Sequence, residues 1–211
     1  MLRLKILLAA LSLVVVAGCG GPRVDVIDLN KVLSVMTATL DKMKKEHGNK
    51  TIDQNDPIAK QKFMKEFNTR FAKDLNAAKM ISKPIGTRIE ADGSVLGFTD
   101  TNKNMVRDYG DRPIFKIEID IARNRLIATD LQYGYRRDSH FSGMSGLVTG
   151  MIIGSLLSRQ RSFGITGSRF SNMRMSPRNY HSSAVSRAKS IARARARARS
   201  RSRSGSFSRG K

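Results

Sequence analysis

The chain has 211 residues and a formal net charge of +22, because 39 Lys and Arg outnumber 17 Asp and Glu. This length suits one folded domain with additional unstructured chain. The single cysteine, Cys19, excludes a disulfide within the chain.

The first residues have the three parts of a secretory signal peptide. Two cations within the first five residues precede an apolar run over residues 6–16, and small residues lead from that run to Cys19. The run is too short to cross a hydrocarbon core of about 30 Å as a helix. The sequence therefore predicts a signal peptide over residues 1–18. An ordinary secretory signal with an incidental cysteine is the alternative.

The site Val16-Ala17-Gly18-Cys19 resembles the lipobox of bacterial lipoproteins. The resemblance implies that the signal is cut before Cys19, and that the cysteine sulfur and the new N-terminus are acylated. Several acyl chains anchor a protein stably, since each buried methylene adds about 0.8 kcal/mol. Gly20 follows where an Asp would imply retention in the inner membrane. We therefore expect residues 19–27 to form a lipidated tether, with the domain at the outer membrane, facing the periplasm.

Two amphipathic helices are predicted after the tether, because apolar residues recur at three- and four-residue steps. The first begins at Leu29, with Asp28 as its N-cap, and ends before Gly48. The second begins behind Asp56, with a proline at its first helical position, and ends near Ser82.

Four short segments then have the period of β-strands, with apolar residues at alternate positions. They cover residues 87–91, 94–98, 114–121 and 126–131. Asp92-Gly93 predicts a type I′ hairpin between the first two. Lys116, Glu118 and Asp120 occupy the solvated face of the third. The expected fold class is α+β over residues 28–138, with two helices packed on a small antiparallel meander of about four strands.

Residues 139–158 form a glycine-rich apolar segment. Gly146, Gly150 and Gly154 fall at four-residue steps, on one face of a helix, and resemble the glycine-zipper segments of envelope lipoproteins. Glycine lets helices approach closely in lipid, so self-association is expected here. The eighteen uncharged residues up to Ser158 would span about 27 Å as a helix. Both a membrane-spanning and a packed helix fit this length.

Residues 159–211 are rich in Arg, Ser and Gly, and residues 139–211 contain 15 Lys and Arg without an acidic residue. Because the segment has few large apolar residues, the sequence predicts a disordered basic tail. In an envelope, the tail would contact anionic lipid or lipopolysaccharide, in a salt-dependent manner. Its Arg-Ser pairs resemble the RS segments of RNA-binding proteins, but the predicted signal peptide argues against a cytoplasmic location. A solvated, functionally neutral tail is the alternative.

A polar loop over residues 100–111 has the oxygen spacing of a calcium site. Side-chain oxygens stand at positions 1, 3, 5, 9 and 12 of the loop, and a main-chain carbonyl at position 7: Asp100, Asn102, Asn104, Asp108, Asp111 and Val106. The pattern resembles EF-hand and dockerin loops. Met105 departs from it by replacing the usual glycine, and Asp111 by replacing Glu. An Asx-rich hairpin loop without calcium is the alternative.

The chain contains no P-loop, Rossmann fingerprint or nucleophile elbow. His47, His140 and His181 stand far apart, without metal-site spacing. We therefore expect a non-catalytic, lipid-anchored envelope protein that acts as a structural or binding module. The alternatives are a basic protein that binds nucleic acid or another polyanion and, less favoured, an envelope hydrolase whose groups meet only in the fold.

Overall fold

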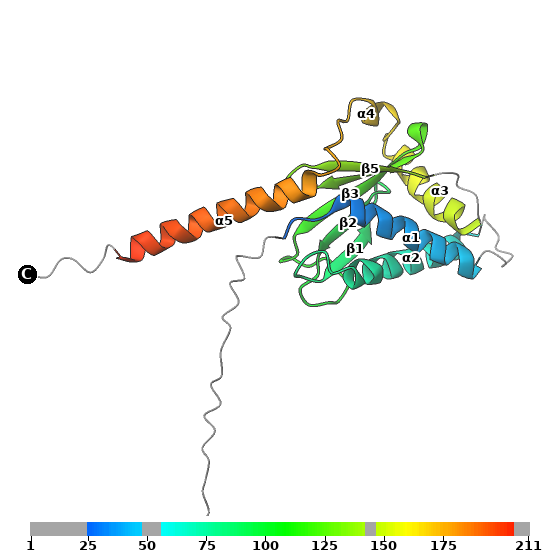
Figure 1. Ribbon diagram of the computed structural model, residues 1–211. Helices are drawn as coiled ribbons and strands as arrows, with labels where there is room; N and C mark the ends of the chain where they lie inside the picture. Colours follow the sequence, from blue (N-terminus) through cyan, green and yellow to red (C-terminus); the bar gives the residue numbers. More distant parts are fainter. Residues whose placement is uncertain (1–24, 48–55, 142–146, 205–211) are drawn as a thin grey trace, which may run out of the picture.

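The computed structural model describes residues 25–47, 56–141 and 147–204 (Figure 1). The signal peptide, Cys19 and Gly146 lie outside these residues. The elements are α1 Leu29–His47, α2 Pro57–Ala77, β1 Ile85–Ile89, β2 Val95–Thr99, β3 Pro113–Asp120, a 3₁₀ turn Ile121–Arg123, β4 Arg125–Asp130, β5 Arg136–His140, α3 Leu147–Ser162, α4 Ser168–Ser171 and α5 Tyr180–Ser204. Figure 1 shows α1 and α2 side by side over one face of the sheet.

The strands form one antiparallel meander in the order β1-β2-β3-β4-β5. This confirms the α+β class, with two helices before the sheet, but the sheet has five strands where about four were predicted. The additional strand, β5, pairs with β4 from Arg125 opposite His140 to Thr129 opposite Arg136. Its sequence RRDSH contains no apolar residue, so the alternation that reveals the other strands is missing.

Local capping explains where the first two helices begin. Asp28 accepts the N–H group of Asn30 at 3.0 Å, and Asp56 accepts that of Ile58 at 2.8 Å. The predicted end of α2 near Ser82 is wrong, because the helix ends at Ala77. There, Lys79 takes a left-handed φ of 47°, which a helix cannot continue through.

The turn between β1 and β2 differs from the predicted type I′ turn. Glu90 donates its N–H group to the Ser94 carbonyl at 2.8 Å, and Gly93 donates to the Glu90 carbonyl at 3.0 Å. A type I′ turn needs positive φ at both central residues, but only Gly93 has it, at 75°. The turn is therefore a three-residue loop whose glycine forms a bulge. The Asp92 side chain stabilises this loop by accepting the Ser94 N–H group.

The main core lies between α1, α2, α3 and the inner face of the sheet. Phe67 and Phe71 stack with ring centroids 5.7 Å apart, and Phe71 meets Phe115 of β3 edge-on at 6.4 Å. The Phe115 ring covers Gly97 on the adjacent strand, where a β-carbon would overlap the ring. Gly97 therefore makes room for the largest side chain of the sheet core.

The outer face of the sheet is covered, which corrects the prediction that Lys116, Glu118 and Asp120 occupy a solvated face. Glu118 and Asp120 are buried. The segment after α3 lies over them and brings Ile165 and Phe170 against Ile127 of β4. The polar alternation of β3 therefore reflects a second, charged packing layer and not exposure to solvent.

The prediction of disorder over residues 159–211 is wrong for residues 159–204. Residues 159–162 complete α3, α4 follows, and α5 runs for 25 residues. Two causes explain this order. Ala and Arg, which alternate in α5, have high intrinsic helix propensity. In addition, Phe170 and Tyr180 are buried against the domain and tie the segment to it.

Candidate functional site

Tyr180, the first residue of α5, is bonded to the start of α1. Its hydroxyl group donates to the Ile27 carbonyl at 3.0 Å and accepts the Leu29 N–H group at 2.6 Å. Nε2 of His181 lies 3.0 Å from the Val26 carbonyl oxygen. Burial of Tyr180 raises its pKa well above the ordinary value, so the phenol stays protonated and keeps its donor. We call residues 26–29 together with 180–181 the clasp.

The clasp places the root of α5 beside the segment that leads to Cys19. Asp25, the first described residue, accepts the N–H group of Ser82 at 3.0 Å and its hydroxyl group at 2.6 Å. Cys19 precedes Asp25 by six residues. Fully extended, that segment spans at most about 21 Å. A lipid on Cys19 would therefore be tethered close to the clasp and to the start of α5.

Helix α5 projects from the body of the molecule (Figure 1). Its 25 residues correspond to a length of about 37 Å. Cations follow one another along its described side chains: Arg187, Lys189, Arg193, Arg195, Arg197 and Arg199. In the Ala-Arg repeat, the cations are two residues apart, a rotation of about 200° around the helix. They therefore lie on two opposite sides of α5.

The predicted calcium loop joins β2 to β3, and its first and last acids are both buried. Asp100 accepts the N–H groups of Asn104 at 3.1 Å and Met105 at 3.0 Å, through different oxygens. Asp111 accepts the N–H group of Asp108 at 3.0 Å. The two carboxylates thus hold the curled main chain of the loop, as turn-forming Asx residues do.

The side chains predicted for positions 3, 5 and 9 converge on one point. The amide groups of Asn102 and Asn104 donate to the same Asp108 oxygen, at 2.7 and 2.8 Å. Rotating either amide by half a turn would present its oxygen to that point. A cation there would replace two amide donors as the partner of Asp108. Val106, the predicted carbonyl ligand, lies on the exposed rim of the loop.

Two residues of this loop have a left-handed backbone, Lys103 with φ of 61° and Met105 with φ of 62°. Met105 stands where the calcium-loop pattern has glycine, and it takes the conformation for which glycine is used. A side chain there costs about 1 kcal/mol or more. The fold thus gives the loop the sharp turn of the pattern in spite of the substitution.

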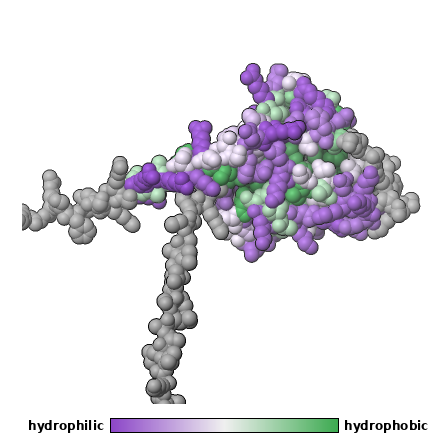
Figure 2. All heavy atoms as spheres, viewed as in Figure 1, coloured by the Kyte–Doolittle hydropathy of each residue, from purple (hydrophilic) through white to green (hydrophobic). Residues whose placement is uncertain are grey.

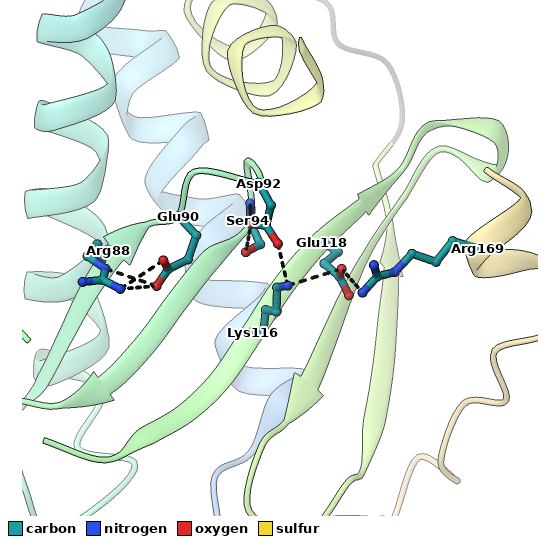
Figure 3. Close-up of polar contacts among 7 residues, drawn as sticks. All are labelled: Arg88, Glu90, Asp92, Ser94, Lys116, Glu118 and Arg169. Atoms are coloured by element: carbon teal, nitrogen blue, oxygen red, sulfur yellow. Dashed lines mark hydrogen bonds and ion pairs between the residues drawn. The ribbon is translucent and has the colours of Figure 1, made fainter. Parts of the chain in front are cut away.

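A row of charged side chains crosses the outer face of the sheet (Figure 3). Lys116 lies 2.7 Å from Asp92 and 3.7 Å from Glu118, and Arg169 of α4 lies 3.1 Å from Glu118. Burial would raise the pKa of Asp92, but hydrogen bonds from Lys116 and Ser94 outweigh it and lower that pKa. These acids and bases neutralise one another and hold α4 on the sheet, which is a structural role.

Arg125 extends this network toward β5. Its guanidinium group donates to Asp120 at 2.8 Å, to Asp138 at 2.9 Å and to the Phe170 carbonyl at 3.3 Å. Burial alone would lower the pKa of Arg125, but the hydrogen bonds to the two carboxylates raise it. Arg125 is thus a permanent cation that joins β3, β5 and α4. Sequence reasoning missed it because each partner lies in a different element.

His47 meets two glutamates that the sequence did not connect with it. Its Nε2 atom lies 3.0 Å from Glu66, and ligand atoms of Glu46, His47 and Glu66 all lie within 4.8 Å of one another. Arg70, however, lies 2.6 Å from Glu46 and 2.8 Å from Glu66. A guanidinium group between the carboxylates occupies the place of a metal ion, so the cluster is an ion-pair network between α1 and α2. The i,i+4 spacing of Glu66 and Arg70 is its only local signal.

The glycines of α3 face away from the core. Gly150 and Gly154 line a groove beside α2. Five apolar residues of the helix are buried against α1 and α2: Met151, Ile152, Ile153, Leu156 and Leu157. A β-carbon at Gly154 would meet no atom within 4 Å. Two of the three predicted glycines thus share an open face. Across the three described ranges, no helix is both long enough and apolar enough to span a bilayer.

Comparison with known proteins adds no relative, because no protein-family model, no curated protein and no solved structure matches the chain.

Proposed function

We propose that the protein is a lipid-anchored, non-catalytic module of the bacterial cell envelope, and that α5 contacts an anionic surface there. The observation that supports this best is the clasp, in which Tyr180 and His181 bond to residues 26–29. A lipid on Cys19 and the root of α5 would then approach the same surface. The outer membrane is the proposed location, because Gly20 and not Asp follows the cysteine.

Two attachments of different kinds strengthen one another at a membrane. The acyl chains supply apolar burial, and each Lys or Arg close to an anionic surface adds about 1 kcal/mol at moderate salt. Because α5 is helical, its cations from Arg187 to Arg199 are held along about 18 Å of the helix axis. Lipid phosphates or lipopolysaccharide are the proposed polyanions.

A binding role fits the described residues better than catalysis does. Their histidines lie in three separate elements, His47 at the end of α1, His140 at the end of β5 and His181 in the clasp. The buried acids Glu118 and Asp120 are paired with arginines, and the pairs hold elements together. Calcium at the 100–111 loop stays a prediction within this proposal, and would act there as a structural ion.

Metabolic labelling tests the lipid anchor. Cells that express the full chain are fed a clickable fatty acid, and the wild type is compared with Cys19→Ala and with Ser12→Ala, a control inside the signal. We expect label on the wild type and on Ser12→Ala only, and a mature N-terminus that begins at residue 19. Equal labelling of Cys19→Ala would sink the proposal.

One observation favours the alternative of nucleic-acid binding. The cations of α5 lie on two opposite sides, and only one side can face a flat membrane. A nucleic acid backbone could contact both. An uncut N-terminus in the cytoplasm, with RNA bound to the purified protein in low salt and released in high salt, would support this alternative.

Self-association through α3 is a further part of the proposal. Gly150 and Gly154 line a groove, and a β-carbon at Gly154 would meet no atom within 4 Å, so a second helix could pack closely there. Crosslinking in detergent should yield a dimer or larger species. Gly150→Leu should remove it, whereas Ser158→Leu at the end of the groove should have less effect. An unchanged pattern in Gly150→Leu contradicts the role of the glycine face.

A further inference from the structure

Exposed apolar side chains gather at one end of the described fold. Eight large apolar residues are exposed among the described residues. Six of them lie in the β2–β3 loop, in the β4–β5 turn or on α5: Met105, Val106, Tyr109, Leu131, Tyr133 and Ile191. The other two, Ile58 at the start of α2 and Phe163 after α3, lie at the opposite end.

The antiparallel meander explains why these segments meet. β2 and β4 end at the same end of the sheet where β3 begins, so loop 100–112 and turn 131–135 lie next to one another there. The Leu131 N–H group donates to the Ile114 carbonyl of β3 at 2.9 Å, so the turn starts beside the first residues of the strand that the loop enters. The hydrogen bond from Ser82 to Asp25 places the segment before α1 at the same end of the sheet. Figure 1 shows these loops and the roots of α1 and α5 on the left of the molecule.

A groove of about 780 Å³ lies between α5 and this end of the sheet. Small or apolar residues of α5 line one wall: Ala188, Ile191, Ala192 and Ala196. Cations stand around it: Lys83, Arg112, Arg195 and Arg199. The acid among its lining residues, Asp25, is already bonded to Ser82. Figure 2 shows apolar surface where the root of α5 meets the body, next to hydrophilic side chains.

We propose that this end is a membrane-docking surface, which inserts Val106, Tyr109, Leu131 and Tyr133 into the interface of an anionic phospholipid bilayer. The groove beside α5 holds lipid phosphates between its cations. Tyrosine favours the level of the head groups, and a large exposed apolar patch marks a site that is covered in use. Apolar loops beside cations match an anionic lipid, which has both an apolar and a charged part.

This inference deepens the proposed function and rests on it for the presence of a membrane, but it needs no lipid on Cys19. It is therefore tested with residues 20–211, which carry no acyl group and retain every described residue. Vesicles of phosphatidylcholine with 30% phosphatidylglycerol are compared with phosphatidylcholine alone. Cosedimentation is expected with the anionic vesicles and is expected to weaken as salt rises.

Insertion can be read directly because the chain contains no tryptophan. Tyr109→Trp should show a blue-shifted emission on anionic vesicles and quenching by lipids brominated on their acyl chains. Phe163→Trp, at the opposite end, should show neither in protein that is equally bound. Equal quenching of the two variants, or quenching of neither, overturns the insertion of this end.

Paired substitutions measure the apolar contribution. Val106→Ser with Tyr109→Ser should lower the vesicle partition coefficient about tenfold, because two side chains lose their burial. Ile58→Ser with Phe163→Ser is the matched control, since Val106 and Phe163 are both 59% exposed, and should change it less than twofold. Circular dichroism confirms that all four substitutions leave the fold intact. Equal effects of the two pairs contradict the proposal.

The outcomes separate this inference from the proposed function. Vesicle binding by residues 20–211 together with unlabelled Cys19 supports the docking surface and removes the lipid anchor. Labelled Cys19 without vesicle binding keeps the anchor and removes the docking surface. A third outcome is that the protein binds a short RNA but not vesicles, and that Val106→Ser with Tyr109→Ser leaves the RNA affinity unchanged. This outcome assigns the cations to nucleic acid and overturns the inference.

Discussion

The Tyr180 hydroxyl group lies 2.6 Å from the Leu29 nitrogen, although 151 residues separate them in the chain. Leu29 is the first residue of α1, where N–H groups have no partner within the helix. A side chain from the other end of the sequence thus caps the first core helix. The same hydroxyl group donates to Ile27 and so fixes the chain that leads into α1.

Tyr180→Phe should lower the free energy of unfolding by about 2 kcal/mol, because a buried N–H group and a buried carbonyl lose their partner. Denaturant unfolding measures the change. Tyr109→Phe removes the same atom from a fully exposed ring and should stay within about 0.5 kcal/mol of the wild type. Equal stability of Tyr180→Phe and the wild type would show that the clasp is not formed in solution.

The turn glycines Gly93 and Gly134 share a φ of 75° but differ in their surroundings. A β-carbon at Gly93 would overlap the Leu156 carbonyl of α3, whereas one at Gly134 meets nothing within 4 Å. Gly134→Ala should cost about 1 kcal/mol for the left-handed backbone alone. Gly93→Ala should cost about 2 kcal/mol more, since α3 must move. Similar losses in the two variants, measured by thermal unfolding, would place α3 away from this turn.

Asp130 is 1% exposed, and its Oδ1 atom accepts the N–H groups of Gln132 and Tyr133. Burial raises its pKa above 3.8, against the lowering effect of these bonds. A group whose pKa is higher in the folded than in the unfolded state stabilises the fold at pH values below its unfolded-state pKa. This contribution is lost as the pH rises through the folded-state pKa. Asp130→Asn should therefore be about 1 kcal/mol more stable than the wild type at pH 7.

This advantage of Asp130→Asn should vanish near pH 3, where the carboxyl group is protonated in both states. Unfolding curves across pH 3 to 7 measure it. Asp41→Asn, at an exposed position of α1, controls for a general effect of charge. A gain for Asp130→Asn that is the same at both ends of the pH range would mean that its carboxyl group is not the cause.

Millimolar calcium should raise the melting temperature of the protein, because a ligand of the native loop stabilises the fold by mass action. The expected affinity is weak, with a Kd of roughly 10⁻⁴ to 10⁻³ M. Asp100→Asn should remove the rise, and magnesium at the same concentration should reproduce little of it. A melting temperature that calcium leaves unchanged makes the loop an Asx-rich hairpin.

Met105→Gly should raise the melting temperature with and without calcium. The free energy of unfolding should rise by up to about 1 kcal/mol. The reason is that Met105 has a φ of 62°, a left-handed conformation that glycine adopts more easily than a residue with a β-carbon. Lys103→Gly, with a φ of 61°, should behave alike. A gain that appears only with calcium would mean that the loop acquires its turn on binding.

The features that could be predicted are those whose cause is local. Asp28 and Asp56 each cap a helix by accepting an N–H group two residues further along the chain. Calcium at the 100–111 loop stays a prediction. β5 could not be predicted, because its order depends on distant partners. Arg137 donates to Asn30 of α1, and Ser176 donates its N–H group to the Arg136 carbonyl.

The same distinction applies to the buried charges and to the C-terminal segment. Glu118 is charged and stands at an alternate position of a β-strand, which together indicate exposure to solvent. It is buried because it pairs with Arg169, which lies 51 residues further along the chain. The low apolar content of α5 predicted disorder, although Ala and Arg favour a helix once Tyr180 starts it. In both cases, composition was a weaker guide than propensity and tertiary pairing.

The clasp also sets the order in which the molecule can be completed. Synthesis delivers the chain from its N-terminus, so α1, α2 and the sheet emerge before residue 180. Until then, the first turn of α1 lacks the cap that the Tyr180 hydroxyl group provides. Closing a contact over 151 residues is slow compared with local helix formation. The clasp therefore forms only after residue 180 is available, and a product truncated before Tyr180 would contain α1 to α4 and the sheet but neither α5 nor the clasp.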